Sequence, residues 1–386
     1  MRYITKTDTE VISHYGDFAI IAPLLYNVHM PPVLSEATQA GYLPDYTKIT
    51  HPIVYDLANE YADSGIAGHV VSVLHTLPAT LQEPVQYTFR HHVTKERPLS
   101  VVHAADELSA DHDKALGIAA CIDVLWNVGI IIDDIYDKDD TNARLQPSAW
   151  AQFGKTRALA ASTAAVAATV SYVARRYSPR DAYSLSHQLY SGVRSLIQSR
   201  SLSLDLSLDH YYANYDMRSG FYTRFPIAAL RRYTGANPEQ IAGVQNSLAR
   251  MNRAGQMIND LQDFDESGER SRAASFSDMR NGVSTIPIRH IWNTINDTTR
   301  QRFSEVHGNT IFGEKELAFM RKLVRDTGVG QAISGHIASE YAAARDEYID
   351  VLAPSTATVQ WLDRWIQYKL AQARTVASTL DESVCN

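Results

Sequence analysis

Long apolar stretches with a helical period dominate the chain from about residue 99 onward. Residues 116–132 are almost continuously apolar, and residues 158–173 are rich in Ala, Val and Thr. Strands seldom exceed about ten residues, so segments of this length favour buried helices. Residues 238–264 predict another helix, and residues 315–380 have the spacing of amphipathic helices. Because no alternating strand pattern of useful length occurs, the pattern predicts an all-α fold.

Proline and glycine mark where the predicted helices end. Helix stops are expected at Ser178 and Pro179, at residues 235–238 and at Gly268. Residues 1–84 carry several prolines and only short helical patterns, such as the one around residues 53–61. We therefore expect residues 1–84 to form an N-terminal helical extension, packed on one continuous domain of residues 85–386.

Composition and charge exclude several classes of protein. Of the 386 residues, 45% are hydrophobic and 20% are charged, which is an ordinary globular balance. The formal net charge of -7 argues against a nucleic-acid partner. The two cysteines, Cys121 and Cys385, do not support a disulfide framework, so a cytoplasmic location is expected. We judge that no apolar run approaches the roughly 18 residues of a spanning helix, so no membrane anchor is expected.

Three aspartates follow the most apolar stretch. Asp133 and Asp137 share a helix face one turn apart, while Asp134 points about 100° away. Carboxylates this close repel one another and raise each other's pKa, so a counter-ion is expected. Mg2+ prefers oxygen ligands and commonly joins one or two carboxylates to a substrate phosphate. The motif predicts a magnesium–diphosphate site, and a solvated acidic helix end is the alternative.

A second polar patch lies about 125 residues later, within residues 255–263. It combines Gln256, Asn259, Asp260 and Asp263, with acidic or amide oxygens at i and i+4. Two such patches facing each other across a helical bundle could clamp a diphosphate through several metal ions. The pair of motifs is much more specific than either one.

Together the two motifs resemble those of the trans-isoprenyl diphosphate synthases, also called polyprenyl synthetases. Further segments similar to those of the family occur in the same order: Lys95-Glu96-Arg97-Pro98, Tyr211, Arg218-Ser219-Gly220-Phe221 and residues 278–287. The resemblance implies an isoprenoid synthase type helical bundle around a deep apolar cavity, with both motifs at its mouth. It also implies a homodimer and a prenyl diphosphate substrate.

The mechanism implied by the resemblance begins with three Mg2+ ions that draw on the diphosphate. The allylic C–O bond then ionises, and a carbocation forms in a cavity that excludes water. The residues expected to bind metal are Asp133, Asp137, Asn259, Asp260, Asp263 and Ser267. Those expected to bind the diphosphate are Lys95, Arg97, Arg144, Arg218 and Gln256. The expected catalytic residues are Asp133, Asp134, Asp137 and Arg218, and the expected cavity residues are Trp126, Val128, Gly129, Phe221 and Tyr222.

The chain departs from the family where the second substrate, isopentenyl diphosphate, is held by a basic pocket. Thr94 stands at the position of a family lysine, Trp126 at that of a histidine, and Val283 at that of another lysine. Only Arg144 remains of a pair of arginines. Asn259 opens the second motif as in class I terpene cyclases, whose further oxygens at i+4 and i+8 correspond to Asp263 and Ser267.

These departures favour an enzyme that acts on a single allylic diphosphate and cyclises or rearranges it to a terpene. The small residues Val128 and Gly129 would leave depth for a substrate of C15 or longer, unless they serve close helix packing. Trp126 could stabilise a carbocation through its π face, or simply pack in the core. The runner-up is a prenyltransferase that uses isopentenyl diphosphate or another acceptor. A third hypothesis is a non-catalytic subunit of a heteromeric synthase.

Overall fold

The computed structural model describes residues 40–45, 49, 51–92, 94–137, 140–141, 146–199, 201–266, 275–309 and 311–382. Its helices are η3 (Ala40–Tyr42), α2 (Pro52–Asp63), α3 (Ile66–Leu74), α4 (Ala79–His91), α5 (Glu96–Glu107), α6 (His112–Asp137), α7 (Ala149–Phe153), α8 (Lys155–Arg176), α9 (Pro179–Ser199), α10 (Leu208–Thr223), α11 (Phe225–Leu230), η5 (Arg231–Tyr233), α12 (Pro238–Gln262), α13 (Ser277–Asn281), α14 (Ile286–Thr294), α15 (Asp297–Val306), α16 (Glu314–Asp326), α17 (Val329–Leu352) and α18 (Thr356–Glu382). These residues form no β-strand, which confirms the all-α prediction.

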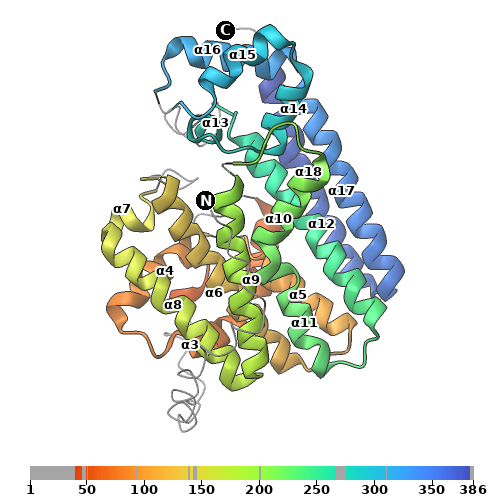
Figure 1. Ribbon diagram of the computed structural model, residues 1–386. Coiled ribbons are helices and arrows are strands. Elements are labelled where there is room, and N and C mark those ends of the chain that lie inside the picture. Colours follow the sequence, from red (N-terminus) through yellow and green to blue (C-terminus); the bar gives the residue numbers. More distant parts are fainter. Residues whose placement is uncertain are drawn as a thin grey trace, which may run out of the picture.

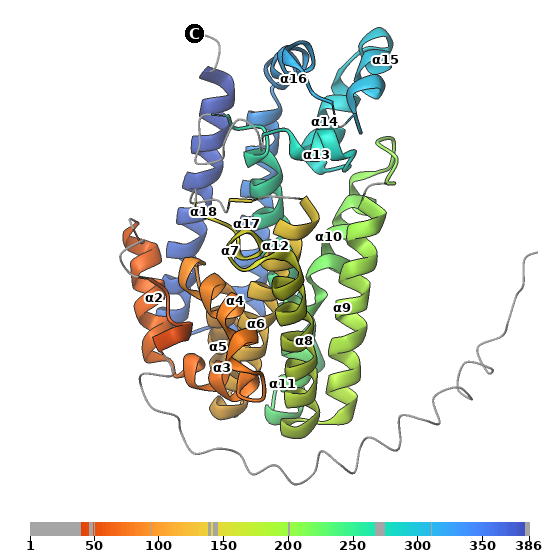
Figure 2. The ribbon, with the colours of Figure 1, turned by 90° about the vertical axis from the view of Figure 1, so that its left-hand side faces the viewer.

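Helix α6 is the centre of one group of helices, and α12 belongs to another (Figures 1 and 2). Helices α3, α4, α5, α7 and α8 pack against α6. Helix α12 packs against α17 and α10, while α17 also packs against α18 and α10 against α9. Helices α13 to α16 lie together at one end of the bundle (Figure 2). Both α6 and α12 run toward that end, so their C-terminal turns, which carry the two motifs, lie on the same side.

The apolar character of α6 corrects the expectation that no run is long enough to span a membrane. The segments His112–Tyr136 and Lys155–Arg176 are both long and apolar enough to do so by length and composition. In α6, however, 78% of the apolar window is buried inside the protein. The packing of six helices around α6, with α11 as the sixth, accounts for its composition, because a helix that is apolar on all sides is suited to the core of a large domain.

The start of α12 is fixed by its sequence. The Asn237 side chain accepts a hydrogen bond of 2.9 Å from the Gln240 amide, and the Gln240 side chain accepts one of 3.0 Å from the Asn237 amide. Pro238 follows at the first helical position, where its missing N–H costs nothing. Helix α9 likewise begins at Pro179, so the helix boundaries expected near residues 178–179 and 235–238 are confirmed. Gly268 lies outside the described residues.

The described part of the N-terminal segment packs on the main body. Helix α2 contains the short helical pattern expected around residues 53–61. Helix α3 packs against α6 and α8. The boundary expected at Pro84 falls inside α4, which itself packs against α6, α7 and α8. The chain is therefore structurally continuous across that position.

Candidate functional site

The first motif lies on the last turns of α6. Asp133 is exposed and Asp134 is half-buried, whereas the side chain of Asp137 lies outside the described part of the structure. Gly129 and Ile132 are exposed on the same helix face as Asp133. A Cβ atom placed on Gly129 would have no other atom within 4 Å, so open space adjoins the motif at this point. Its neighbour Val128 is buried in the core instead.

Asp260 of the second motif is buried and engaged with protein donors. Tyr215 donates its hydroxyl to Oδ2, and Gln256 Nε2 donates to Oδ1 at 2.8 Å. Burial raises the pKa of Asp260 to about 6, although hydrogen bonds from Tyr215 and Gln256 and the charge of Arg218 oppose the rise. The structure therefore brings Gln256 and Arg218 to Asp260, and Gln256 donates to a carboxylate of its own helix.

Asp263 holds the turn that follows α12. Its Oδ1 accepts hydrogen bonds from the Ser277 amide at 3.0 Å and from the Ser277 hydroxyl at 2.6 Å. Its Oδ2 accepts a third from the Asp278 amide at 3.1 Å. These groups belong to the first turn of α13, whose amides have no partner within the helix. Asp263 therefore acts as a capping residue for α13 in this structure.

The fit of the site to a divalent cation depends on which oxygens remain accessible. Among the described residues, no three His, Cys, Asp or Glu side chains form a group that could hold a metal ion. The side chains of Asp133 and Asn259 are exposed, and that of Asp134 is half-buried. Carboxylate and amide oxygens are suitable ligands for a hard cation such as Mg2+, and such sites are commonly completed by water and substrate phosphate. Of the expected ligands and phosphate-binding residues, Ser267 and Arg144 lie outside the described residues.

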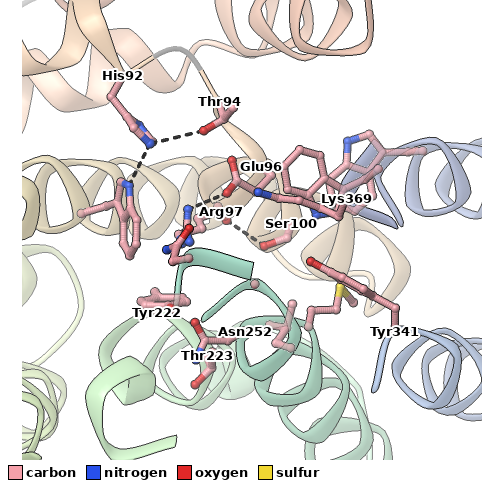
Figure 3. A pocket seen from close by; sticks show the side chains of 17 residues that line it. His92, Thr94, Glu96, Arg97, Ser100, Tyr222, Thr223, Asn252, Tyr341 and Lys369 are labelled. Atoms are coloured by element: carbon pink, nitrogen blue, oxygen red, sulfur yellow. Dashed lines mark hydrogen bonds and ion pairs between the residues drawn. The ribbon is translucent and has the colours of Figure 1, made fainter. Parts of the chain in front are cut away.

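A cavity of about 180 Å3 lies between α5, α6, α10, α12, α17 and α18 (Figure 3). Asn259 places the second motif at its wall. The lining residues are His92, Thr94, Glu96, Arg97, Ser100, Trp126, Tyr222, Thr223, Leu248, Met251, Asn252, Gly255, Asn259, Tyr341, Trp361, Trp365 and Lys369. Only Leu248 and Met251 have apolar side chains without an aromatic ring, so this cavity is polar and aromatic.

Trp126 and Tyr222 line this cavity, and one face of Trp126 is covered. The guanidinium carbon of Arg97 lies 3.3 Å from the centroid of the Trp126 ring and 5.3 Å from that of Tyr222. Trp126 Nε1 donates to His92 Nε2 at 3.1 Å (Figure 3). Phe221 packs edge-to-face on Tyr222 with centroids 4.9 Å apart, yet it does not line the cavity. Arg97 and Trp126 therefore form a stacked pair at one wall.

Lys95 does not reach the site, although we expected it to bind diphosphate. Its side chain is fully buried, and its Nζ atom lies 3.2 Å from both carboxylate oxygens of Asp123. The same ammonium lies 4.5 Å from the centroid of the Phe89 ring. Arg97, two residues later, points into the cavity instead. The two cations of this segment thus serve different parts of the protein.

Two charged residues of the cavity, Glu96 and Lys369, were not predicted from the sequence. Glu96 lies between Lys95 and Arg97, and an acidic residue inside a basic segment was the available signal. Lys369 follows Trp361 and Trp365 at intervals of four residues on α18, so the three share one helix face. The spacing was sufficient to predict that these three residues share a helix face. It was not sufficient to predict that this face lines the cavity.

Comparison with known proteins gives consistent matches. Residues 78–324 match the family model described as polyprenyl synthetase. A short chain isoprenyl diphosphate synthase of Methanocaldococcus jannaschii is 22% identical over 214 residues, which is 54% of this chain and 64% of that relative. The chain thus matches less than two thirds of the length of this curated relative.

Solved structures support the fold. A polyprenyl synthase from Caulobacter crescentus, complexed with calcium and isoprenyl diphosphate, has a TM-score of 0.70 at 16% identity and covers 83% of this chain and 97% of its own. A decaprenyl diphosphate synthase from Rhodobacter capsulatus has the same TM-score at 16% identity, covering 83% of this chain and 99% of its own. At this identity the similarity establishes the isoprenoid synthase type of helical bundle and nothing finer.

Proposed function

Because the chain belongs to the polyprenyl synthetase family, we propose that it ionises an allylic prenyl diphosphate and transfers the prenyl group to an acceptor. The observation that carries this proposal is the cavity beside the second motif. It places Asn259 in one space with Arg97, Trp126 and Tyr222. An oxygen ligand for a metal ion and aromatic side chains thus line one space beside the second motif.

The residues have separate roles in the proposed reaction. Asp133, Asp134 and Asn259 would hold Mg2+, which neutralises the charge that develops on the departing diphosphate. The family resemblance implies three such ions. Arg218, whose charge acts on Asp260 and Tyr222, would bind a diphosphate oxygen. Asp260 and Asp263 would support the site by fixing Tyr215 and the first turn of α13.

The bonds that change can be stated for the transfer. The allylic C–O bond breaks, and its electron pair leaves with the diphosphate. An electron pair of the acceptor forms the new bond to the allylic carbon, and the acceptor's proton passes to a diphosphate oxygen. Gly129 and the open space beside it favour a substrate of C15 or longer. We further propose a homodimer in the cytoplasm, as the resemblance and the cysteine usage imply.

Cyclisation of the same allylic substrate is the second candidate. It is favoured by the loss of cations from the family's second-substrate pocket, where Thr94 and Trp126 replace a lysine and a histidine, and Lys95 is buried on Asp123. In that reaction an alkene of the substrate itself would supply the electron pair. The family match favours transfer, since the relatives are named as synthases of prenyl diphosphates.

The test uses purified protein, Mg2+ and the C10, C15 and C20 allylic diphosphates, each with and without isopentenyl diphosphate. We expect release of diphosphate from at least one substrate, and loss of at least about 100-fold in rate in Asp133→Asn. A terpene formed from the allylic substrate alone would establish cyclisation. Failure of all three substrates to release diphosphate, in protein that binds them, would refute an enzymatic function and favour the non-catalytic subunit.

A further inference from the structure

The cavity beside the second motif contains an anionic side chain of the protein itself. Glu96 is 7% exposed, and its Oε1 accepts a hydrogen bond of 2.5 Å from Arg97 Nη1. The side chain of Lys369 extends from α18 toward the same carboxylate (Figure 3). One buried carboxylate thus lies near the two cations that line this cavity.

The charge state of Glu96 follows from its neighbours. Burial opposes ionisation, but Arg97 and Lys369 together hold the pKa of Glu96 below its usual range. Glu96 is therefore a carboxylate at neutral pH. Lys369 responds in the opposite sense, because burial lowers its pKa to about 8 although Glu96 opposes the change. Glu96 thus offsets one of the two positive charges of the cavity before any ligand binds.

A second diphosphate would be poorly accommodated here. It would have to displace the Glu96 carboxylate from Arg97 or lie beside it, and like charges in a partly buried site repel strongly. The stacking of Arg97 on Trp126 restricts the guanidinium further. The family lysine that could compensate is replaced by Thr94, and Lys95 is held by Asp123.

The cavity has the features of a site for a small uncharged molecule. Its volume of about 180 Å3 is close to the roughly 150 Å3 of an engineered cavity that holds benzene. Five aromatic side chains line it, namely Trp126, Tyr222, Tyr341, Trp361 and Trp365. The Glu96 carboxylate can accept a hydrogen bond from a ligand, and the aromatic rings can contact its carbon skeleton.

We propose that Glu96 is a built-in counter-anion, through which this cavity selects an uncharged prenyl acceptor and rejects a second diphosphate. The acceptor would be a small unsaturated or aromatic molecule with one O–H or N–H group that donates to the Glu96 carboxylate. This inference rests on the proposed prenyl transfer and names its second substrate class. Glu96 is thereby a specificity-determining residue.

The test is calorimetric titration of the full chain with Mg2+ present and the allylic site filled by the unreactive C15 thiolodiphosphate. The probes are isopentenyl diphosphate and isopentenol, which share a carbon skeleton but differ in charge. In the wild type, isopentenol should bind at least as tightly as isopentenyl diphosphate. In Glu96→Gln, isopentenyl diphosphate should bind at least 10-fold more tightly than in the wild type. The control is Glu107→Gln on the same helix, outside the cavity, which should leave both affinities unchanged.

A wild type that binds isopentenyl diphosphate at least 10-fold more tightly than isopentenol would overturn the proposal. So would a Glu96→Gln variant that gains nothing. If that variant does not fold, Lys369→Met in the wild-type background decides: an unchanged affinity for isopentenyl diphosphate supports the proposal, and a weakened one refutes it. Release of diphosphate from allylic substrates is measured separately, so failure of the proposed function is distinguishable from failure of this inference.

Discussion

The ammonium of Lys95 lies 3.2 Å from both carboxylate oxygens of Asp123, and neither side chain is more than 1% exposed. Asn127 Nδ2 also donates to Asp123 Oδ1 at 3.0 Å, which satisfies a further lone pair of this carboxylate. The pair ties the start of α5 to the middle of α6. Lys95, which we expected to bind diphosphate, thus positions helix α5 instead. Arg97 reaches the cavity from this helix.

Loss of one member of this pair should destabilise the protein. Lys95→Met leaves the Asp123 carboxylate buried without its counter-ion, which typically costs about 3–5 kcal/mol. Urea unfolding at pH 7 measures the change. Adding Asp123→Leu should recover part of the loss, because a buried pair can often be replaced by apolar groups.

The matched control is Lys322→Met, which removes a lysine from an exposed pair with Asp326. Exposed pairs contribute about 0–1 kcal/mol, so its unfolding free energy should change little. A Lys95→Met protein as stable as the wild type would contradict the buried pair.

The two motifs should respond differently to substitution. Asp133 is exposed at the end of α6, so Asp133→Ala should raise the Mg2+ concentration required for diphosphate release and leave stability within about 0.5 kcal/mol. Asp263 accepts three hydrogen bonds from Ser277 and Asp278, so Asp263→Ala should lose about 1–3 kcal/mol of stability. Magnesium titrations of activity and urea unfolding of both variants separate these effects. A large shift in Mg2+ requirement for Asp263→Ala at unchanged stability would identify Asp263 as a metal ligand instead.

Residue periodicity was sufficient to predict the helices but not the partners of individual polar side chains. The apolar run at 116–132 predicted α6, and the Asn237–Pro238 signal marked the start of α12. Both depend on local backbone preferences, which the neighbouring residues determine.

The site was harder to predict because charged residues close in sequence point to different surroundings. Lys95 and Arg97 lie two positions apart, yet one contacts Asp123 and the other Trp126, both on α6. Lys369 lies more than 270 residues later in the chain, and packing of α18 against α12 and α17 brings it near Glu96. Such assignments depend on tertiary packing, which spacing along the chain does not contain.

The pKa of Lys369 gives a pH-dependent prediction. Burial lowers it from an ordinary 10.5 to about 8, so between these values the unfolded chain binds more protons than the folded one. The contribution of Lys369 to stability is therefore greatest above pH 10.5 and is lost as pH falls through 8.

Lys369→Met should be more stable than the wild type at pH 7, by up to about 3 kcal/mol, and this advantage should shrink toward pH 10. Urea unfolding at pH 7, 8, 9 and 10 measures the trend, and an advantage that does not depend on pH would contradict the assignment.

The last prediction concerns the exposed face of α9. Tyr183, Tyr190, Val193 and Ile197 are between 58% and 74% exposed and lie on one side of this helix. Contiguous exposed apolar surface marks interaction sites, and a second copy of the chain is the partner that the family resemblance implies. Val193→Glu with Ile197→Glu should therefore weaken dimerisation at least about 100-fold, because it places charges in a desolvated interface.

Light scattering coupled to gel filtration would show a dimer for the wild type and a monomer for the double variant. Ile311→Glu, which changes an 81% exposed residue outside α9, is the matched control and should remain dimeric. A wild type that is monomeric at tens of micromolar, or a double variant that still dimerises, would rule out this face as the interface.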